Sequence, residues 1–295
     1  MQETWTIKDL LAWTTRFFTD KGIEEPRLNA EALLARVLKK DRVYLYANYF
    51  APVNQNEREQ YRELIKRRAA REPLAYLLGK REFMSLDFRV TPEVLIPRPE
   101  TELLVETVLQ LATKDQPVSI CDVGTGSGAI AVSLAYYIPH AQVTAIDISG
   151  AALEIARYNA EEHGVKVHFL EGDLLASVPA GEQFDFICAN LPYISEAEYP
   201  KLDPEVLHYE PRLALWGSGD GLELYRRLIP QAWQHLHSDG YLLMEIGCNQ
   251  AEAAVALCSA FSQVQVRQDW AGRDRLIIAQ KGDVSGEDHI LAGES

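Results

Sequence analysis

The first part of the chain has apolar residues spaced three and four positions apart, which is the spacing of the buried face of a helix. Three such stripes precede residue 75. Pro26, Pro52 and Pro73 lie between or just after the stripes, where helices are expected to break. The pattern therefore predicts a small helical domain over residues 1–75. The stripes consist of Leu10, Leu11, Trp13 and Phe17, of Ala32, Leu33, Leu34, Val37 and Leu38, and of Tyr61, Leu64 and Ile65.

The pattern changes between residues 76 and 100. Residues 83–90 partly alternate between apolar and polar side chains, which predicts a strand or a hairpin. Pro97 and Pro99 then favour an extended backbone, and the acidic residues that follow them suit the start of a helix. We interpret residues 76–100 as a linker or lid between two domains.

From Val118 onward, short apolar runs alternate with helical patterns. Strands separated by crossover helices predict a doubly wound α/β fold with a mostly parallel sheet. Two late segments, 264–267 and 275–280, are typical of a closing antiparallel pair and bring the predicted sheet to seven strands. This domain is expected to span residues 101–282, and the polar residues 283–295 are expected to form a disordered tail. The other predicted strands are 118–123, 142–147, 165–170, 184–189 and 241–246, and the predicted helices are 129–137, 151–163 and 222–237.

The distribution of charge limits which kinds of macromolecule the chain is expected to bind. The chain of 295 residues has a net charge of −14, but residues 1–80 carry 15 Lys and Arg against 11 Asp and Glu, while the remainder carries 14 against 32. An acidic body argues against direct binding of duplex nucleic acid, because neutralising phosphates needs a basic face. The basic N-terminal part could dock on an acidic partner or on RNA, although residues 66–71 (KRRAAR) equally fit an ordinary solvated helix.

Membrane, disulfide and metal signals are missing from the sequence. The opening residues mix polar and apolar side chains, unlike a signal peptide, and the longest apolar runs are too short to cross a bilayer. The four cysteines form no CxxC pair and the seven histidines are scattered, so we interpret the cysteines as reduced and expect no metal. These observations predict a soluble cytoplasmic protein without membrane association, and nothing in the sequence requires more than a monomer.

A glycine-rich turn follows the first predicted strand of the α/β domain. Gly124, Gly126 and Gly128 occupy alternate positions, so the backbone can turn sharply and approach a ligand closely. Asp147 ends the next strand, 23 residues after Gly124, where a carboxylate can accept hydrogen bonds from both hydroxyls of a ribose. Asp173 follows the third strand and is placed to meet an adenine amino group.

These features alone allow either a dinucleotide or S-adenosylmethionine. The glycines are spaced GxGxG rather than GxGxxG, and the acidic Asp122 precedes them. A pyrophosphate prefers the open N-terminus of a helix. The spacing here resembles instead the methyltransferase motif that holds the methionyl part of S-adenosylmethionine, which we therefore expect as the cofactor.

The segment Asn190-Leu191-Pro192-Tyr193 follows the fourth predicted strand, whose carboxyl end faces the ligand crevice in an open α/β sheet. The side-chain oxygen of Asn190 and the carbonyl of Leu191 can accept both hydrogens of an NH2 group. Pro192 restricts Leu191 to an extended conformation, which helps to aim that carbonyl. Tyr193 offers a flat face against which a planar amide or base can stack. The segment predicts methyl transfer to a planar amide or amino nitrogen, although an isolated Asn-x-Pro-Tyr is also an ordinary turn at a strand end.

Several longer motifs resemble the HemK/PrmC family, the peptide chain release factor N5-glutamine methyltransferases. The resemblance extends from about Glu72 to Ile278, and the combination of IPRPETE with the asparagine motif is more specific than either motif alone. The helical N-terminal segment also fits the small substrate-docking domain of that family. The matching segments are REFMSLDFRV, VLIPRPETELLVE, DVGTGSGAIAVSLA, AIDISGAALEIARYNA, NLPYIS, EPRLALWGSGDGLELYRRL and LLMEIG.

The resemblance implies a Rossmann-like methyltransferase sheet and methylation of the glutamine in the Gly-Gly-Gln loop of class-1 release factors. It places Arg98, Glu100 and Thr101 at the wall of the substrate pocket, for which the alternative is a helix start with a structural ion pair. It also implies that residues 190–193 hold the glutamine side chain. The implied cofactor contacts are Asp122, Gly124, Thr125, Gly126, Ser127, Gly128, Asp147, Asp173, Leu174 and Asn190.

One departure from the family keeps a second enzyme class open. The family usually has Asn-Pro-Pro-Tyr, whereas this chain has Leu191 at the second position. The resemblance requires only a backbone carbonyl there, so the chemistry should survive, but Asn-Leu-Pro-Tyr is also characteristic of rRNA adenine dimethyltransferases. The alternatives are therefore an adenine-N6 methyltransferase acting on RNA or DNA, and a binding module that retains the fold without catalysis. The intact glycine turn, Asp147 and Asn190 argue against the binding module.

Overall fold

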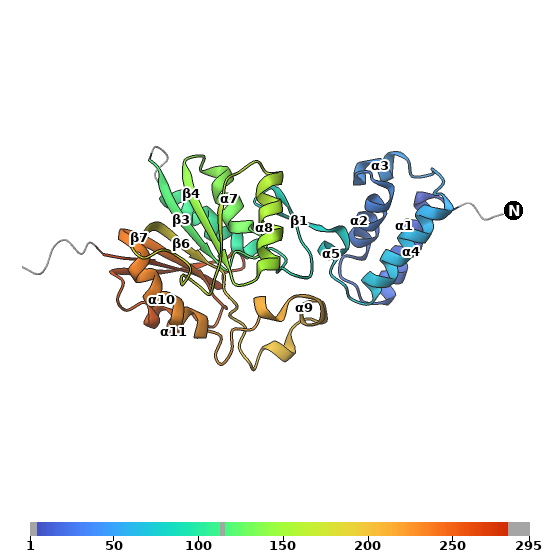
Figure 1. Ribbon diagram of the computed structural model, residues 1–295. Coiled ribbons are helices and arrows are strands. Elements are labelled where there is room, and N and C mark those ends of the chain that lie inside the picture. Colours follow the sequence, from blue (N-terminus) through green and yellow to red (C-terminus); the bar gives the residue numbers. More distant parts are fainter. Residues whose placement is uncertain (1–4, 113–115, 283–295) are drawn as a thin grey trace, which may run out of the picture. The chain divides into compact units, whose positions relative to one another are not determined.

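The computed structural model describes residues 5–112 and 116–282, which form two compact units (Figure 1). The helical unit contains the described residues up to Arg81 together with Asp203–Tyr209. The sheet unit contains Glu82–Leu202 and the described residues from Glu210 onward. The chain therefore passes between the units three times. The tail predicted for residues 283–295 lies outside the described residues.

The helical unit consists of five consecutive helices and the later α9, and its interior is mainly an apolar cluster with a few buried polar side chains. Capping boxes begin two of its helices: Thr6 with Asp9 at α1, and Asn54 with Glu57 at α4. The predicted helical stripes are confirmed except at Trp13, which is 50% exposed and stacks on Phe17 at the surface. The helices are α1 (Ile7–Asp20), α2 (Pro26–Leu38), α3 (Arg42–Ala47), α4 (Gln55–Ala69), α5 (Leu74–Leu78) and α9 (Pro204–Tyr209).

The cations of the basic run KRRAAR differ in burial: Arg68 is in the interior, whereas Lys66 and Arg67 are at the surface. Arg68 is buried and donates from Nε to Asn29 Oδ1 at 2.7 Å and from Nη2 to Glu205 Oε1 at 2.7 Å. Its neighbours Lys66 and Arg67 lie on the surface in ion pairs. One arginine of the run is therefore an interior residue that ties α9 to α4 and α2, whereas the flanking cations fit the expected solvated helix.

The sheet unit is built on a seven-stranded sheet of order β5-β4-β3-β6-β7-β9-β8. The pairs from β5 to β7 are parallel, and β9 pairs antiparallel with both β7 and β8. The predicted mostly parallel, doubly wound fold is thus confirmed, including the closing antiparallel pair. The strands are β3 (Val118–Val123), β4 (Ala141–Asp147), β5 (His168–Glu171), β6 (Phe184–Ala189), β7 (Leu236–Glu245), β8 (Gln263–Gln268) and β9 (Asp274–Gln280).

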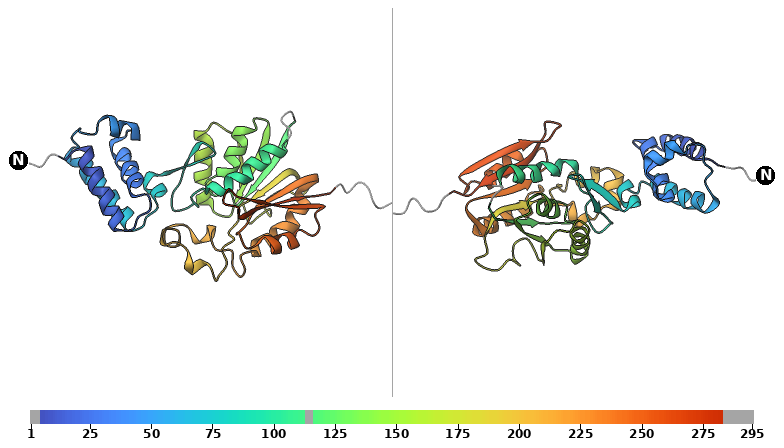
Figure 2. Two further views of the ribbon diagram at one scale, coloured as in Figure 1. Left: turned by 180° about the vertical axis from the view of Figure 1, so that it is seen from behind. Right: turned by 90° about the horizontal axis from the view of Figure 1, so that it is seen from above.

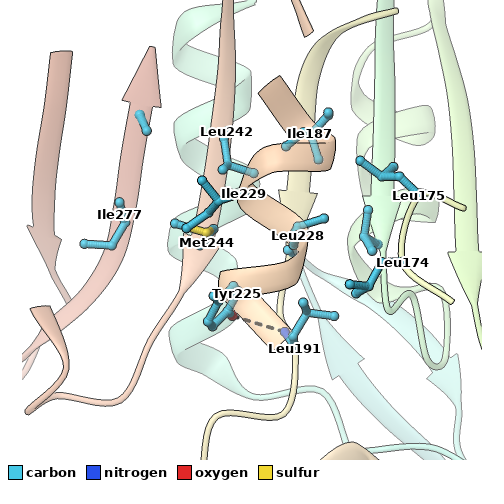
Figure 3. Close-up of a cluster of buried hydrophobic side chains, with 14 of the residues drawn as sticks. Leu174, Leu175, Ile187, Leu191, Tyr225, Leu228, Ile229, Leu242, Met244 and Ile277 are labelled. Carbon is cyan, nitrogen blue, oxygen red and sulfur yellow. Dashed lines mark hydrogen bonds between the residues drawn. The ribbon is translucent and has the colours of Figure 1, made fainter. Parts of the chain in front are cut away.

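Helices cover both faces of this sheet, as the views in Figure 2 show. Side chains of α6 and α7 pack with Phe186 and Cys188 of β6 on one face, whereas α10 and α11 pack with Ile187 and Ala189 on the other. Successive β6 residues therefore enter different cores, as the alternation of a strand requires. Figure 3 shows α10 lying over the second core. The helices of this unit are α6 (Glu102–Leu111), α7 (Ala129–Tyr137), α8 (Gly150–Glu162), α10 (Glu223–His235) and α11 (Ala251–Leu257), with short 3-10 turns at Pro99–Thr101, Tyr199–Lys201 and Arg212–Ala214.

The hairpin expected near residues 83–90 is present as β1 (Lys80–Phe83) and β2 (Leu86–Arg89). Met84 and Ser85 join the strands with φ values of 50° and 57°, the left-handed conformation that a tight two-residue hairpin turn requires. Phe83 and Phe88 are buried against the same core as α6 and α7. The hairpin is therefore packed onto the sheet unit rather than extended into solvent.

Two strands differ from their predicted limits by more than one residue. The strand predicted at 165–170 is observed only from His168, because it pairs with a single neighbour, β4. The strand predicted at 241–246 begins earlier, at Leu236, and a register shift between Phe184 and Phe186 accommodates the extra residues. No helix within the described ranges is both long and apolar enough to cross a membrane.

A buried carboxylate in the helical unit gives a test of its packing. The side chain of Glu31 is fully buried and accepts hydrogen bonds from Arg27, Arg42 and Tyr46. Burial raises the pKa of this carboxyl, but the bonds from Tyr46, Arg42 and Arg27 outweigh burial and hold the pKa below its usual value of 4.5. The carboxylate therefore stabilises the fold above pH 4.5, and this contribution is lost as the pH falls through the depressed pKa.

We expect Glu31→Gln to lower the free energy of unfolding at neutral pH by about 1–3 kcal/mol, because charge-assisted bonds are lost although both arginines remain partly exposed. Urea unfolding of the two proteins should show this gap closing in acid, since the amide of the variant cannot titrate. Glu63→Gln removes an exposed ion pair and should change nothing measurable. A gap that stays constant down to strongly acidic pH would contradict the assignment.

Candidate active site

The candidate site lies where the strand order reverses. The chain runs outward from β3 to β4 and β5 and then returns to β6, which pairs with the other side of β3. The carboxyl ends of β3 and β6 are therefore adjacent, and a crevice between the loops that follow them is expected at such a point. A cavity of about 550 Å³ occupies this position and is lined by residues of both loops, a size suited to a cofactor with part of its substrate.

The glycine turn after β3 is held against the neighbouring strand. The amides of Gly124 and Thr125 both donate to the carbonyl of Ile146 on β4, at 2.8 and 2.9 Å. Gly124 has φ 76°, and a Cβ there would lie 2.8 Å from Leu191 Cδ2. A Cβ on Gly128 would lie 3.1 Å from Ala156 Cβ on α8. Glycine is needed at both positions because the backbone approaches other parts of the unit so closely.

Asp122 lies beneath this turn rather than at the cavity. Its carboxylate is fully buried, and Oδ2 accepts from Thr125 Oγ1 at 2.6 Å and from the amide of Ala131 at 3.2 Å. Burial is the main cause that raises the pKa of Asp122 to about 7. Neither Asp122 nor Gly128 lines the cavity, whereas Gly124, Thr125, Gly126 and Ser127 do. Asp122 thus supports the turn from below.

Asp147 lines the cavity at the end of β4. Its Oδ2 accepts from the amide of Gly126 at 2.8 Å and its Oδ1 from the amide of Ser149 at 2.9 Å. Burial raises the pKa of Asp147, although the backbone amides act in the opposite direction. Each carboxylate oxygen can accept more than one hydrogen bond, so both oxygens can also meet donors of a ligand.

Asp173 and Leu174 line the same cavity beyond β5. Leu174 is buried and has φ 55°, a left-handed conformation that is unusual for leucine. The carboxylate of Asp173 forms an ion pair with Arg227 of α10, which also lines the cavity. Sequence reasoning missed Arg227, which meets Asp173 across 54 residues of chain, although the matching motif EPRLALWGSGDGLELYRRL contains it.

Asn190 follows the last residue of β6 and lines the cavity. Asp147 lines the cavity from the end of β4, which lies on the other side of β3 in the same sheet. Asn190 Nδ2 donates to Thr101 Oγ1 at 3.1 Å. Pro192 also lines the cavity, whereas Tyr193 does not, and its hydroxyl donates inward to Glu245 at 3.1 Å. Burial raises the pKa of Tyr193, so the phenol stays protonated at neutral pH.

Leu191, where the family usually has proline, makes two contacts of its own. Its side chain is 5% exposed and packs against Gly124 and the core beneath α10. Its amide donates to the hydroxyl of the buried Tyr225 at 3.2 Å (Figure 3). That hydroxyl in turn donates to the carbonyl of Glu245. A proline could not supply the amide hydrogen. Leu191 therefore joins the asparagine motif to α10 and to β7.

The segment before α6 is fixed by a second buried carboxylate, Glu210. It accepts from the amide of Ile96 at 3.1 Å and from the guanidinium of Arg98 at 2.5 Å. Arg98 and Thr101 line the cavity, whereas Glu100 does not. The structural ion pair that sequence reasoning allowed for Arg98 does exist, but its partner is Glu210. The matching motif EPRLAL was the signal that could have indicated this residue.

Family models match both parts of the chain. Residues 9–79 match the PrmC N-terminal domain, and residues 120–208 match a methyltransferase domain. Among solved structures, the hMettl16 catalytic domain has a TM-score of 0.55 at 18% identity, covering 76% of this chain and 82% of that one. A methyltransferase from Pyrococcus furiosus has a TM-score of 0.50 at 18% identity, covering 77% and 99%. At this identity, the two structures show a shared fold alone.

Relatives of similar length match almost the whole chain. The release factor glutamine methyltransferase of Geobacter sulfurreducens is 46% identical over 95% of this chain and 98% of its own. That of Rhodopirellula baltica is 41% identical over 94% and 97%, and that of Moorella thermoacetica is 44% identical over 94% and 99%. The family that the sequence motifs indicated is thereby confirmed: this chain belongs to the release factor glutamine methyltransferases.

Proposed function

We propose that this chain transfers a methyl group from S-adenosylmethionine to the side-chain amide nitrogen of the glutamine in the Gly-Gly-Gln loop of class-1 release factors. The observation that carries the proposal is identity of 41–46% with release factor glutamine methyltransferases over nearly the full length of both chains. The cavity supports it, because Asn190 and the glycine turn lie at adjacent strand ends of one sheet.

The residues of the cavity fit the proposed cofactor. S-adenosylmethionine supplies an electrophilic methyl group on a sulfonium centre. Asp147 offers carboxylate oxygens to the ribose hydroxyls, and the turn from Gly124 to Ser127 offers backbone groups close to the cavity. Leu174 provides an apolar surface for the adenine, and Asp173, paired with Arg227, lies beside it for the adenine amino group. Asp122 contributes indirectly, by supporting the turn.

The asparagine motif fits a planar NH2 group. We assign the acceptance of its two hydrogens to Asn190 Oδ1 and to the carbonyl of Leu191. Tyr193, expected from the sequence to be a stacking surface, does not line the cavity and supports the motif through its bond to Glu245. An amide nitrogen is a poor nucleophile, so alignment of its lone pair with the methyl carbon must supply much of the acceleration. As the nitrogen–carbon bond forms and the carbon–sulfur bond breaks, the nitrogen loses a proton, which we assign to solvent water.

The two units suggest a division of labour. We assign substrate docking to the helical unit, in line with the match of residues 9–79 to the PrmC N-terminal domain, and methyl transfer to the sheet unit. Residues 76–100 remain our proposed linker and residues 101–282 our proposed catalytic domain. A monomer acting in the cytoplasm is part of the proposal.

The adenine-N6 alternative has less support, since its best argument is the leucine in Asn-Leu-Pro-Tyr. A single assay separates the two: transfer of labelled methyl from S-adenosylmethionine to a purified release factor, to its Gln→Ala loop variant, and to rRNA. We expect label on the wild-type factor alone. Label on rRNA alone would replace glutamine methylation with adenine methylation as the function.

Asn190→Ala tests the substrate contact. The variant should bind S-adenosylmethionine almost normally, yet lose methyl transfer by about 100-fold or more, because the amide nitrogen is no longer aligned. Isothermal titration gives the first quantity and the labelled-methyl assay the second. Asn249→Ala, at an exposed residue, serves as the matched control. Turnover equal to wild type would remove Asn190 from the mechanism.

Asp147→Ala tests the cofactor contact. Loss of charge-assisted bonds to the ribose should weaken binding of S-adenosylmethionine by about 10- to 100-fold. Asp147→Asn keeps the shape and one acceptor, so its dissociation constant should fall between those of the wild type and the alanine variant. An unaltered dissociation constant for Asp147→Ala would show that the ribose is held elsewhere.

A further inference from the structure

A line of hydrogen bonds runs from Asn190 into the interior of the sheet unit. Asn190 Nδ2 donates to Thr101 Oγ1 at 3.1 Å, and Thr101 Oγ1 donates to Glu245 Oε2 at 2.6 Å. The other carboxylate oxygen of Glu245 accepts from the hydroxyl of Tyr193 at 3.1 Å. Thr101 is 4% exposed and Glu245 is 2% exposed, so solvent does not compete for these bonds.

While Glu245 is ionised, the donors and acceptors in this chain of hydrogen bonds can be arranged in only one way. A carboxylate accepts hydrogen bonds and donates none, and a threonine hydroxyl has a single hydrogen. The hydrogen of Thr101 is therefore committed to Glu245, which leaves only a lone pair of Oγ1 for Asn190. Only the NH2 end of the Asn190 amide can meet a lone pair, so its oxygen must point the other way.

The surroundings of Glu245 shift the pKa of its carboxyl in opposite directions. Burial raises the pKa of this carboxyl, and Glu100 acts in the same sense, whereas the bonds from Thr101 and Tyr193 and the charge of Arg275 lower it. Arg275 is itself held by Asp269 and by the carbonyl of Ile246. Thr101 and Tyr193 each direct a hydroxyl hydrogen at a different oxygen of Glu245, and this geometry fits the carboxylate form, which accepts both.

We propose that Glu245, acting through Thr101, is a positioning residue that fixes the Asn190 amide with its oxygen toward the substrate nitrogen. A flipped amide would present hydrogens to an NH2 group and could not accept from it. The same orientation favours a primary amide over a carboxylate, which has no hydrogen to donate when ionised. This inference rests on the proposed function, because it explains how the same asparagine selects glutamine.

The first test observes the hydrogen bond itself and requires no activity. In protein with 15N-labelled asparagine, the side-chain NH2 signals of Asn190 are identified by their loss in Asn190→Ala. We expect these hydrogens to exchange with water about tenfold faster in Thr101→Val and in Glu245→Leu than in the wild type. Thr107→Val is the matched control, since Thr107 is a buried threonine of α6 that donates to Leu103 in its own helix. Equal exchange in the wild type and Thr101→Val would overturn the proposal.

The second test measures methyl transfer to the release factor in a double-mutant cycle. Thr101→Val should lower kcat by about 10- to 100-fold with little change in the affinity for S-adenosylmethionine, and Thr101→Ser should recover most of the loss. If Thr101 acts only through Asn190, the variant with both Asn190→Ala and Thr101→Val should be no slower than Asn190→Ala. Multiplied losses would mean that Thr101 acts independently of Asn190, and the proposal would fail.

Together, the two tests can distinguish failure of the amide orientation from failure of the proposed substrate. Slow NH2 exchange that depends on Thr101, without methylation of a release factor by the wild type, would leave the amide orientation in place and reject the proposed substrate. Should Glu245→Leu fail to fold, Thr101→Val still decides the matter, because it removes the same connection. Thermal unfolding of each variant shows which of them remain folded.

Discussion

The parallel pairing of β3 with β6 is the constraint on which the rest of the site depends. Val123 and Ala189 are partners in this pairing, so the residues that follow them, Gly124 and Asn190, emerge side by side from the sheet. Backbone hydrogen bonds fix that register, and both strands are buried on both faces. The contact between Leu191 and Gly124 is a direct result, because only a glycine leaves room for the leucine methyl group. The glycine turn and the asparagine motif are thus brought together by main-chain geometry before any side chain contributes.

Three buried carboxylates then give the surrounding loops their shape. Asp122 holds the glycine turn, Glu210 holds the segment around Arg98, and Glu245 holds Thr101 and Tyr193. A buried carboxylate is costly unless it is hydrogen-bonded, so each one constrains the donors around it strongly. The bonded groups lie in turns, in the 3-10 turn Pro99–Thr101 or at the start of α7, where few strand or helix hydrogen bonds order the backbone, so the carboxylates supply bonds there.

The sequence was a good guide wherever the information was local. The limits of β3 and β6 were predicted correctly, because both are continuous apolar runs of central strands, whereas the edge strand β5 and the shifted start of β7 depend on their neighbours. The glycine turn, Asp147 and Asn190 were recognisable from short motifs. Glu210 and Glu245 lie within the matching motifs EPRLAL and LLMEIG, but their partners Arg98 and Thr101 could not be identified, since they are 112 and 144 residues away and only the fold brings them together. The placement of Glu205 beside Arg68, 137 residues earlier, was beyond local patterns for the same reason.

The return of α9 to the helical unit has a consequence for the modularity of this protein. A family-model match that ends at Gly79 suggests a cassette that could be excised or exchanged by a single cut. The cassette is incomplete, because Glu205 and Tyr209 bond to Arg68 and Ala70 from a segment that is encoded far downstream. A chimera joined only near residue 80 would pair the α4 of one parent with the α9 of the other. Recombination in this family should therefore preserve residues 203–209 together with the N-terminal helices, so that the inherited unit is discontinuous in sequence although it is compact in space.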